Sequence, residues 1–278
     1  MSKIADKIID EISAAIENDE LQLPTLPEVA LEVREAAGNE NIDVPKLAEI
    51  VARDAALTAR MIKVANSSLY RANSEIQDLQ TAIGRFGIVT ASNLATAAAM
   101  QQMFLTTSKI IEDRMQAVWT KSVEVASICH ALARHFSKLK PEQAALGGLV
   151  HRIGALPILL YAERNDALTN NHALLDEVVE AAHREIGARI LDKWEFPDAL
   201  KDVPSQYTNF ERTLDEADYV DIVMVANVQS HMGTDHPLAD LDWSSVSAFA
   251  RLGLAAAPES LEAEAFVDEV QEAARMLN

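Results

Sequence analysis

The chain of 278 residues is long enough to bury one large core, and 49% of its residues are hydrophobic. Its net charge of −19, from 24 basic and 43 acidic residues, argues against a nucleic-acid partner, because binding to a phosphate backbone depends on lysine and arginine. The chain shows no run of about 18 apolar residues and no apolar N-terminal leader, so we expect no membrane span and no signal peptide. A single cysteine, Cys129, cannot form an internal disulfide, which suits a cytoplasmic protein.

The first predicted element is an amphipathic helix over residues 3–18. Its isoleucines recur every four residues and form one apolar stripe, made of Ile4, Ile8, Ile12 and Ile16. This stripe packs either on its own domain, which we favour, or on a second copy in a homodimer. The following stretch 23–27 is expected to be extended, because each of its two prolines disfavours helix at the residue before it.

Five helical segments are predicted between residues 28 and 104. Asp43, Asp54 and Asp78 each stand just before one of them, where an aspartate is a good N-cap. The expected segments are 28–38, 44–52, 55–65, 79–86 and an alanine-rich stretch at 90–104. The polar break Asn66–Tyr70 either caps the end of the third segment or lines a groove between helix clusters.

The second half of the chain is also helical in pattern. A long apolar seam runs over 108–139, Pro141 fits the first turn of the next helix, and another long pattern covers 174–194. Thr213 and Glu216 match a capping box for a buried helix around 222–226, and Ser244 and Ser260 are expected N-caps of two final helices. No segment has a competing strand pattern, so we predict an all-α protein.

We expect three parts along the chain. Residues 1–18 form the N-terminal helix, and residues 19–230 form the main domain. Within that domain a front helical cluster at 19–107 and a rear cluster at 108–230 share one core. The remaining helices, in 231–278, are expected to pack on the domain.

Five short motifs together resemble the HDOD family, whose members are helical bacterial signalling domains related to the HD metal-dependent phosphohydrolases. The motifs are LPTLPEV at 23–29, DAALTAR at 54–60, ANS at 65–67, GGLVHRIG at 147–154 and HREIGARILDKW at 183–194. The resemblance covers roughly residues 20–230 and implies a multi-helical, HD-domain-like architecture.

In the HD hydrolases, the resemblance implies metal ligands from an early His, a His-Asp doublet and a late Asp. Carried over by position, these fall at Lys121, at His151-Arg152 and at Asn227, and His183 matches a histidine that the family often retains. The doublet therefore has a guanidinium where the hydrolases have a carboxylate.

These substitutions predict a degenerate metal site. A guanidinium does not lose its proton, and one cation about 4 Å from another costs roughly 4 kcal/mol at an effective dielectric near 20. A divalent ion beside Arg152 and Lys121 is therefore disfavoured, and we expect no metal, no cofactor and no hydrolysis by the HD route.

Several alternatives stay open. His151 and His183 are either leftover ligands or core groups bonded to backbone, and Arg152 either pairs internally or, with Lys121, binds a small anion or nucleotide. A hydrolase could instead draw substitute ligands from nearby acids such as Glu185 and Asp221. Four further histidines are assigned to non-ligand positions, His130 and His135 to the surface and His231 and His236 to a loop of turn-forming residues.

The function we predict from these residues is a non-catalytic signalling or adaptor module of HDOD type that acts by binding a protein partner. The resemblance implies that such partners are other bacterial signal-transduction components. The competing functions are a metal-dependent phosphohydrolase with substitute ligands and a small-anion or nucleotide sensor.

Overall fold

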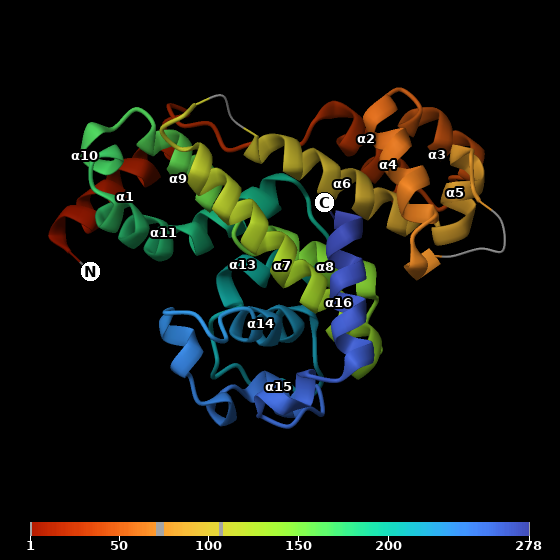
Figure 1. Ribbon diagram of the computed structural model, residues 1–278. Helices are drawn as coiled ribbons and strands as arrows, with labels where there is room; N and C mark the ends of the chain where they lie inside the picture. The colour runs from red at the N-terminus through yellow and green to blue at the C-terminus, as the bar shows by residue number, and fades with distance from the viewer. Residues whose placement is uncertain (1, 71–74, 106–107, 278) are drawn as a thin grey trace.

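The computed structural model describes residues 2–70, 75–105 and 108–277, and helices are the only regular secondary structure among them (Figure 1). The N-terminal and front helices are α1 (Lys3–Glu17), α2 (Glu28–Gly38), α3 (Val44–Val51), α4 (Ala55–Ala65), α5 (Leu79–Phe86) and α6 (Ile88–Phe104), with the short 3-10 helix η1 (Ser68–Tyr70). The rear helices are α7 (Glu112–Phe136), α8 (Pro141–Val150), α9 (Ala155–Ala162), α10 (Asp166–Thr169), α11 (His172–Lys193), α12 (Asp198–Lys201), α13 (Val203–Gln206) and α14 (Tyr219–Gln229). The C-terminal elements are η2 (Pro237–Asp240), η3 (Trp243–Ser245), α15 (Ser247–Arg251), η4 (Pro258–Leu261) and α16 (Glu264–Leu277).

The predicted caps of the front helices are confirmed. Asp43, Asp54 and Asp78 each accept a hydrogen bond from the backbone N–H three residues further on, at 2.8 to 2.9 Å. Each bond satisfies an amide that has no partner within its own helix.

Four predicted helix starts in the second half are wrong. The capping box lies at Asp218 and Asp221 rather than at Thr213 and Glu216, because the two aspartates accept from each other's backbone N–H and α14 begins only after them. Ser244 and Ser260 lie within the 3-10 helices η3 and η4, so they do not cap α15 and α16. Helix α7 begins at Glu112, four residues after the predicted start at Ser108.

Helix α1 packs against α11 of the same chain. Ile8, Ile12 and Ile16 are buried in this contact, as the periodicity predicts. Ile4 is instead 62% exposed, because the residue that turns inward in the first turn is Ala5. The stripe is therefore covered by the chain itself and is not presented to a second copy.

Helix α7 is the centre of the molecule. It crosses the middle of the ribbon in Figure 1 and contacts α8, α14 and α16, while α6 of the front cluster packs on both α7 and α8. Because it has partners on several sides, every residue from Val125 to Ala133 is buried, and the simple one-sided seam of the sequence becomes a helix enclosed all round. Front and rear clusters share one apolar core, which also includes the C-terminal helices.

The stretch Pro141–Ala162 is the most apolar long segment among the candidate spans of the described residues, although we expected no membrane span. It has the length and hydropathy of a membrane-crossing helix, but 83% of its most apolar window is buried inside the fold. Helices α8 and α9, which make up this stretch, are core helices packed against α7.

Helix α16 covers the far side of α7 and corrects the assignment of His130. This histidine is 2% exposed, because Glu269 of α16 lies over it with Oε1 3.2 Å from Nδ1. Arg134 and His135 approach the same carboxylate at 3.3 Å. Burial alone would raise the pKa of Glu269, but His130, Arg134 and His135 together lower it below its usual value.

This cluster predicts a pH-dependent stability. A carboxylate with a lowered pKa stabilises the fold above its unfolded pKa, near 4.5, and that contribution is lost as the pH falls through the folded value. Glu269→Gln should therefore reduce the free energy of unfolding by about 1–3 kcal/mol at pH 7, and the difference from the wild type should shrink below pH 4.5. Urea unfolding between pH 3.5 and 7 measures it, with the exposed neighbour Asp268→Asn as control; a Glu269→Gln effect that does not change with pH would contradict the assignment.

Candidate functional site

His151 ends α8 and is completely buried. Its Nδ1 lies 2.6 Å from the carbonyl oxygen of Gly148, and because a carbonyl can only accept, Nδ1 carries the proton. The other nitrogen, Nε2, is then an acceptor, and it has no hydrogen-bond partner among the residues that the structure describes. Burial, the Arg152 guanidinium, His183 and Lys121 hold the pKa of His151 well below its usual value, so the ring is neutral.

His183 comes to the same place from α11. Its Nδ1 lies 2.7 Å from the carbonyl oxygen of Val179 and its Nε2 lies 2.8 Å from the hydroxyl of Tyr207. Burial and the nearby Arg152 lower the pKa of His183 to about 4, while burial raises the pKa of Tyr207 to about 12. The His183 ring is therefore neutral, and its Nε2 accepts a hydrogen bond from the hydroxyl group of Tyr207.

Tyr207 lies between the two histidines. Its ring is 5.0 Å from that of His151, edge to face, and 6.1 Å from that of His183. Sequence reasoning missed this residue, because a lone tyrosine just after a short helix carries no motif. Both histidines are thus core groups bonded to backbone carbonyls, as favoured from the sequence.

Arg152 forms an ion pair with Glu180 of α11 and also interacts with Tyr207. The guanidinium is 15% exposed. Internal pairing was one of the two interpretations open for Arg152, and Glu180 satisfies it at a separation of 28 residues along the chain.

Lys121 enters from α7 and connects to the end of α14. Its ammonium donates to the backbone carbonyl of Ser230 and lies 3.0 Å from a carboxylate oxygen of Glu124. Asn227 is buried one turn earlier on α14, at 3% exposure. Lys121, Arg152 and His183 therefore converge on His151, since all three lower the pKa of its ring.

His231 and His236 lie beside this group, which the sequence did not indicate. Their rings stack at 3.8 Å, and His236 Nδ1 accepts from the backbone N–H of Leu238 in the first turn of η2. Burial and Lys121 are the two largest causes that lower the pKa of His231 to about 4. His236 acts as a cap of the turn, in agreement with its assignment to a loop.

The residues present do not fit a hydrolase metal. In the described part of the chain no three His, Cys, Asp or Glu side chains are placed to hold an ion. Of the two matched histidines only His151 has a ring nitrogen open to a ligand, because His183 Nε2 is taken by Tyr207. The adjacent carboxylate that an HD site needs is replaced by Arg152.

The substitute ligands considered from the sequence do not repair the site. Asp221 is fully buried and is held by two arginines, with Arg251 donating from Nε and a terminal nitrogen at 2.8 and 2.7 Å and Arg212 at 3.3 Å. Its lone pairs are therefore occupied. Glu185 is exposed on α11, two residues beyond His183. Residues i and i+2 of a helix do not face each other, so Glu185 does not lie beside the His183 ring.

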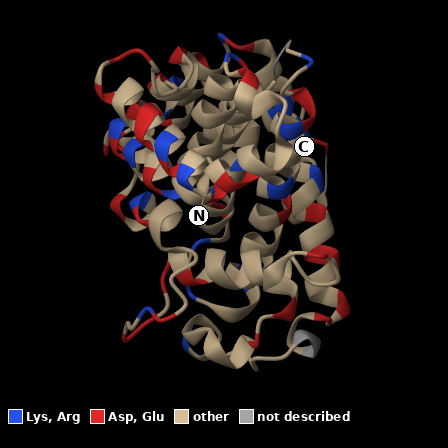
Figure 2. Ribbon diagram, turned by 90° about the vertical axis from the view of Figure 1, so that its left-hand side faces the viewer, with Lys and Arg blue, Asp and Glu red and all other residues tan. Residues whose placement is uncertain are grey.

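A cavity of about 210 Å³ opens beside Arg152 between α7 and α11. Its charged lining consists of Arg114, Lys121, Arg152, Asp176 and Glu180. Arg114 pairs with Asp176 as Arg152 does with Glu180, and basic and acidic stretches alternate over the face shown in Figure 2. An anion entering this cavity would have to displace carboxylates that already hold the cations.

Comparisons with known proteins place the chain among helical relatives. The sequence profile of the "HDOD domain" family matches residues 23–210. A structure of a Shewanella amazonensis SB2B protein, named "putative metal-dependent phosphohydrolase", is 29% identical and covers 99% of each chain with a TM-score of 0.86. A Marinobacter aquaeolei VT8 protein, named "putative signal transduction protein", shares the fold at 21% identity and a TM-score of 0.64, covering 93% of this chain and 60% of that one.

A curated relative from Treponema pallidum (strain Nichols) is an uncharacterized protein, 25% identical over 216 residues. The match takes in 72% of this chain but only 38% of that relative. This chain therefore matches less than half of the length of that relative.

Proposed function

This chain belongs to the HDOD domain family, and on that basis we propose that it is a non-catalytic bacterial signal-transduction module that acts by binding a protein partner. The observation that carries the proposal is Arg152, which stands in the ligand position of the HD doublet and is paired with Glu180. A permanent cation at that position repels a metal ion. The carboxylate of Glu180 is occupied by the ion pair with Arg152 and is not free to bind a metal.

The buried histidines support the same conclusion. A metal ligand must offer a free nitrogen and is normally oriented by a second-shell partner on its other nitrogen. His183 has both nitrogens engaged, one by the Val179 carbonyl and one by Tyr207. The pair therefore stabilises, through Tyr207, the packing of α13 on α11 beside the turn that follows α8, rather than a reaction.

A phosphohydrolase is the second candidate, because the Shewanella protein that is 29% identical bears that name. It would need ligands other than Asp221, which is bound by two arginines, and other than the exposed Glu185. A sensor of small anions at Lys121 and Arg152 is the third, and it would need to break the Arg152–Glu180 pair. The contacts of Asp221 with two arginines count against the hydrolase, and the Arg152–Glu180 pair counts against the anion sensor.

The cysteine content and the net charge are compatible with the proposed signalling module. The one cysteine, Cys129, is fully buried, and burial raises the pKa of its thiol, so it is protonated and unreactive in the fold. Because a single cysteine cannot form an internal disulfide, we propose a cytoplasmic location. The net charge of −19 favours protein partners over nucleic acid.

Hydrolysis of bis(p-nitrophenyl) phosphate in the presence of Mn²⁺, Fe²⁺ or Mg²⁺ tests the proposal. We expect the rate to equal that of buffer with metal alone, and to be the same for the wild type and for His151→Ala and His135→Ala. A metal-dependent rate that His151→Ala abolishes and His135→Ala preserves would establish the hydrolase instead.

A further inference from the structure

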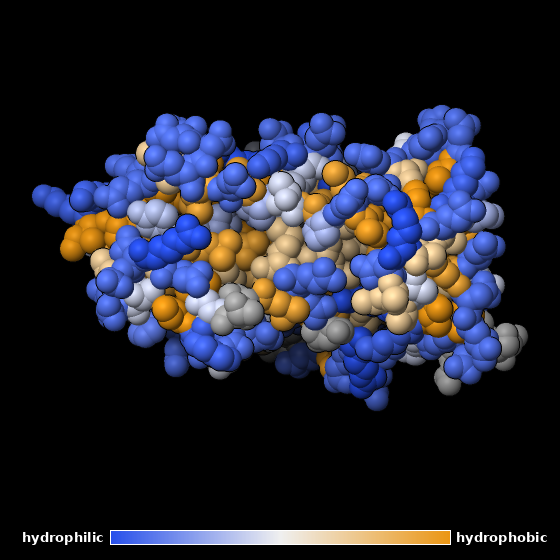
Figure 3. Space-filling view, turned by 90° about the horizontal axis from the view of Figure 1, so that it is seen from above, coloured by the Kyte–Doolittle hydropathy of each residue, from blue (hydrophilic) through white to orange (hydrophobic). Residues whose placement is uncertain are grey.

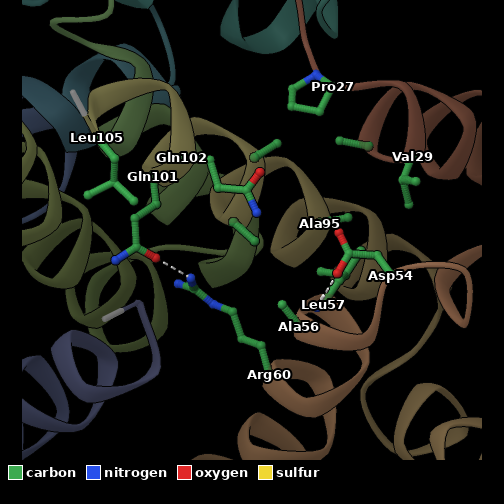
Figure 4. Close-up of a pocket in the computed structure, with 13 residues that line it drawn as sticks. Pro27, Val29, Asp54, Ala56, Leu57, Arg60, Ala95, Gln101, Gln102 and Leu105 are labelled. Atoms are coloured by element: carbon green, nitrogen blue, oxygen red, sulfur yellow. Dashed lines mark hydrogen bonds between the residues drawn. The ribbon is translucent and has the colours of Figure 1, made fainter. Parts of the chain in front are cut away.

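A second cavity lies in the front cluster, far in sequence from the histidines. It has a volume of about 190 Å³ and is bounded by α2, α4 and α6 (Figure 4). Most of its wall is small and apolar, contributed by Val29, Ala30, Ala56, Leu57, Ala95, Ala98, Ala99 and Leu105. Ala56, Gln102 and Leu105 are exposed, so a molecule can reach the cavity from solvent, and the face seen from above in Figure 3 carries apolar surface.

Arg60 of α4 supplies a cation to this apolar wall. It donates to the side-chain oxygen of Gln101 at 2.6 Å and to the backbone carbonyl of Leu277. These two bonds use only part of the five N–H groups of a guanidinium, and the buried Nε–H has no acceptor. Over the described ranges, no carboxylate lies within ion-pair distance of Arg60, although a charge removed from water is normally paired with an opposite one.

The acid that also lines the cavity is already in use. Asp54 accepts from the backbone N–H of Leu57 at 2.9 Å and caps α4. In Figure 4 its carboxylate is turned toward Leu57, whereas the Arg60 guanidinium extends toward Gln101 at the other side of the cavity. The cavity therefore has one end with donor groups and an apolar remainder.

We propose that this cavity binds a small monocarboxylate, with its carboxylate at Arg60 and its short apolar body on the alanines of α4 and α6. An arginine fork matches a carboxylate in shape and charge. A dry cavity of about 150 Å³ accommodates a benzene-sized molecule, so this one suits a ligand of about eight non-hydrogen atoms by the same comparison. A straight-chain carboxylate such as n-hexanoate has that size, and the site is independent of the proposed signalling function.

Titrations observed by ligand NMR test the proposal with n-hexanoate, acetate and 1-hexanol on the folded full chain. We expect n-hexanoate to bind with a Kd on the order of 0.1–1 mM. Acetate lacks the apolar body and 1-hexanol lacks the charge, so each should bind at least about tenfold more weakly.

Two variants of one helix provide a matched control. Ala56 and Ala59 are both exposed on α4, but only Ala56 lines the cavity. Ala56→Leu should abolish n-hexanoate binding by filling the space, and Ala59→Leu should leave the Kd unchanged. Arg60→Met should remove the preference for n-hexanoate over 1-hexanol.

The proposal is overturned by equal binding of n-hexanoate and 1-hexanol, by binding that persists in Ala56→Leu, or by no binding at millimolar ligand. Because Ala56→Leu leaves Arg60 and its contacts in place, loss of the fold in Arg60→Met does not remove the test. Extension of the chain by Gly-Ser-Gly after Asn278 is a further control. This variant should bind n-hexanoate with the same Kd as the wild type or with a lower one, and loss of binding in the extended chain would count against the proposal.

Discussion

Asp221→Asn is expected to lower the free energy of unfolding by about 3–5 kcal/mol, because it leaves the buried Arg251 without a counter-charge and leaves Arg212 with Asp218 as its one carboxylate partner among the described residues. The carboxylate is fully buried, and the side chains of Arg212 and Arg251 are only 13% and 10% exposed. Asparagine keeps the shape but offers one acceptor oxygen and no charge. Unfolding by urea measures the loss, and the melting temperature should fall by about 10 °C.

The control for this substitution is Asp215→Asn, an exposed aspartate in the loop before α14, which should change stability by less than about 0.5 kcal/mol. A double-mutant cycle between Asp221→Asn and Arg251→Met should give a coupling free energy of at least about 2 kcal/mol. Additive effects would mean that the pair does not hold α15 on α14, contrary to the geometry.

Gly154→Ala is expected to reduce the free energy of unfolding by about 3 kcal/mol or more, at the upper end of the range for overpacking. A Cβ at this position would lie 2.0 Å from the carbonyl oxygen of His183 and 2.5 Å from the backbone nitrogen of Gly187. Backbone atoms of a long helix cannot move aside as a side chain can, so α11 would have to separate from the turn that follows His151. Thermal and urea unfolding measure the effect.

Gly84→Ala is the matched control for the same change. Gly84 lies inside α5, and a Cβ there meets no atom within 4 Å. Alanine should therefore stabilise the protein by about 0.5–1 kcal/mol through its better helix propensity. If Gly154→Ala were tolerated as well as Gly84→Ala, the close contact between His183 and Gly154 would be wrong.

Local signals predicted most of the helices. The isoleucine stripe of α1 and the aspartate caps of α3, α4 and α5 depend only on neighbours a few residues away. The structure confirms the three caps and the stripe apart from Ile4. The false capping box at Thr213 shows the limit of such signals. Two pairs of residues in the same loop satisfy the pattern, and the contacts of Asp221 with distant Arg251 favour the second.

Burial of polar groups could not be predicted from spacing. His130 looks like a surface residue on α7, because its cover comes from α16, more than a hundred residues later. The same holds at the candidate site, where spacing could not predict three contacts that form only on folding. Glu180 pairs with Arg152, Tyr207 bonds to His183, and Lys121 acts on His231.

The resemblance did more for the site than periodicity could. It named positions on four separate helical segments, and the structure brings Lys121, Arg152 and His183 close enough to His151 to lower the pKa of its ring. The resemblance could not give the residues that contact these positions. Whether Arg152 faces a ligand or a carboxylate depends on Glu180, which lies outside every motif.

The most direct test of the degenerate site is the metal content of the purified chain after equilibration with Mn²⁺, Fe²⁺ under anaerobic conditions, or Zn²⁺, followed by desalting and elemental analysis. A centre that offers one imidazole nitrogen beside a guanidinium should retain far less than one ion per chain, and His151→Ala should retain no less than the wild type. One tightly held transition metal per chain that disappears in His151→Ala would contradict the account.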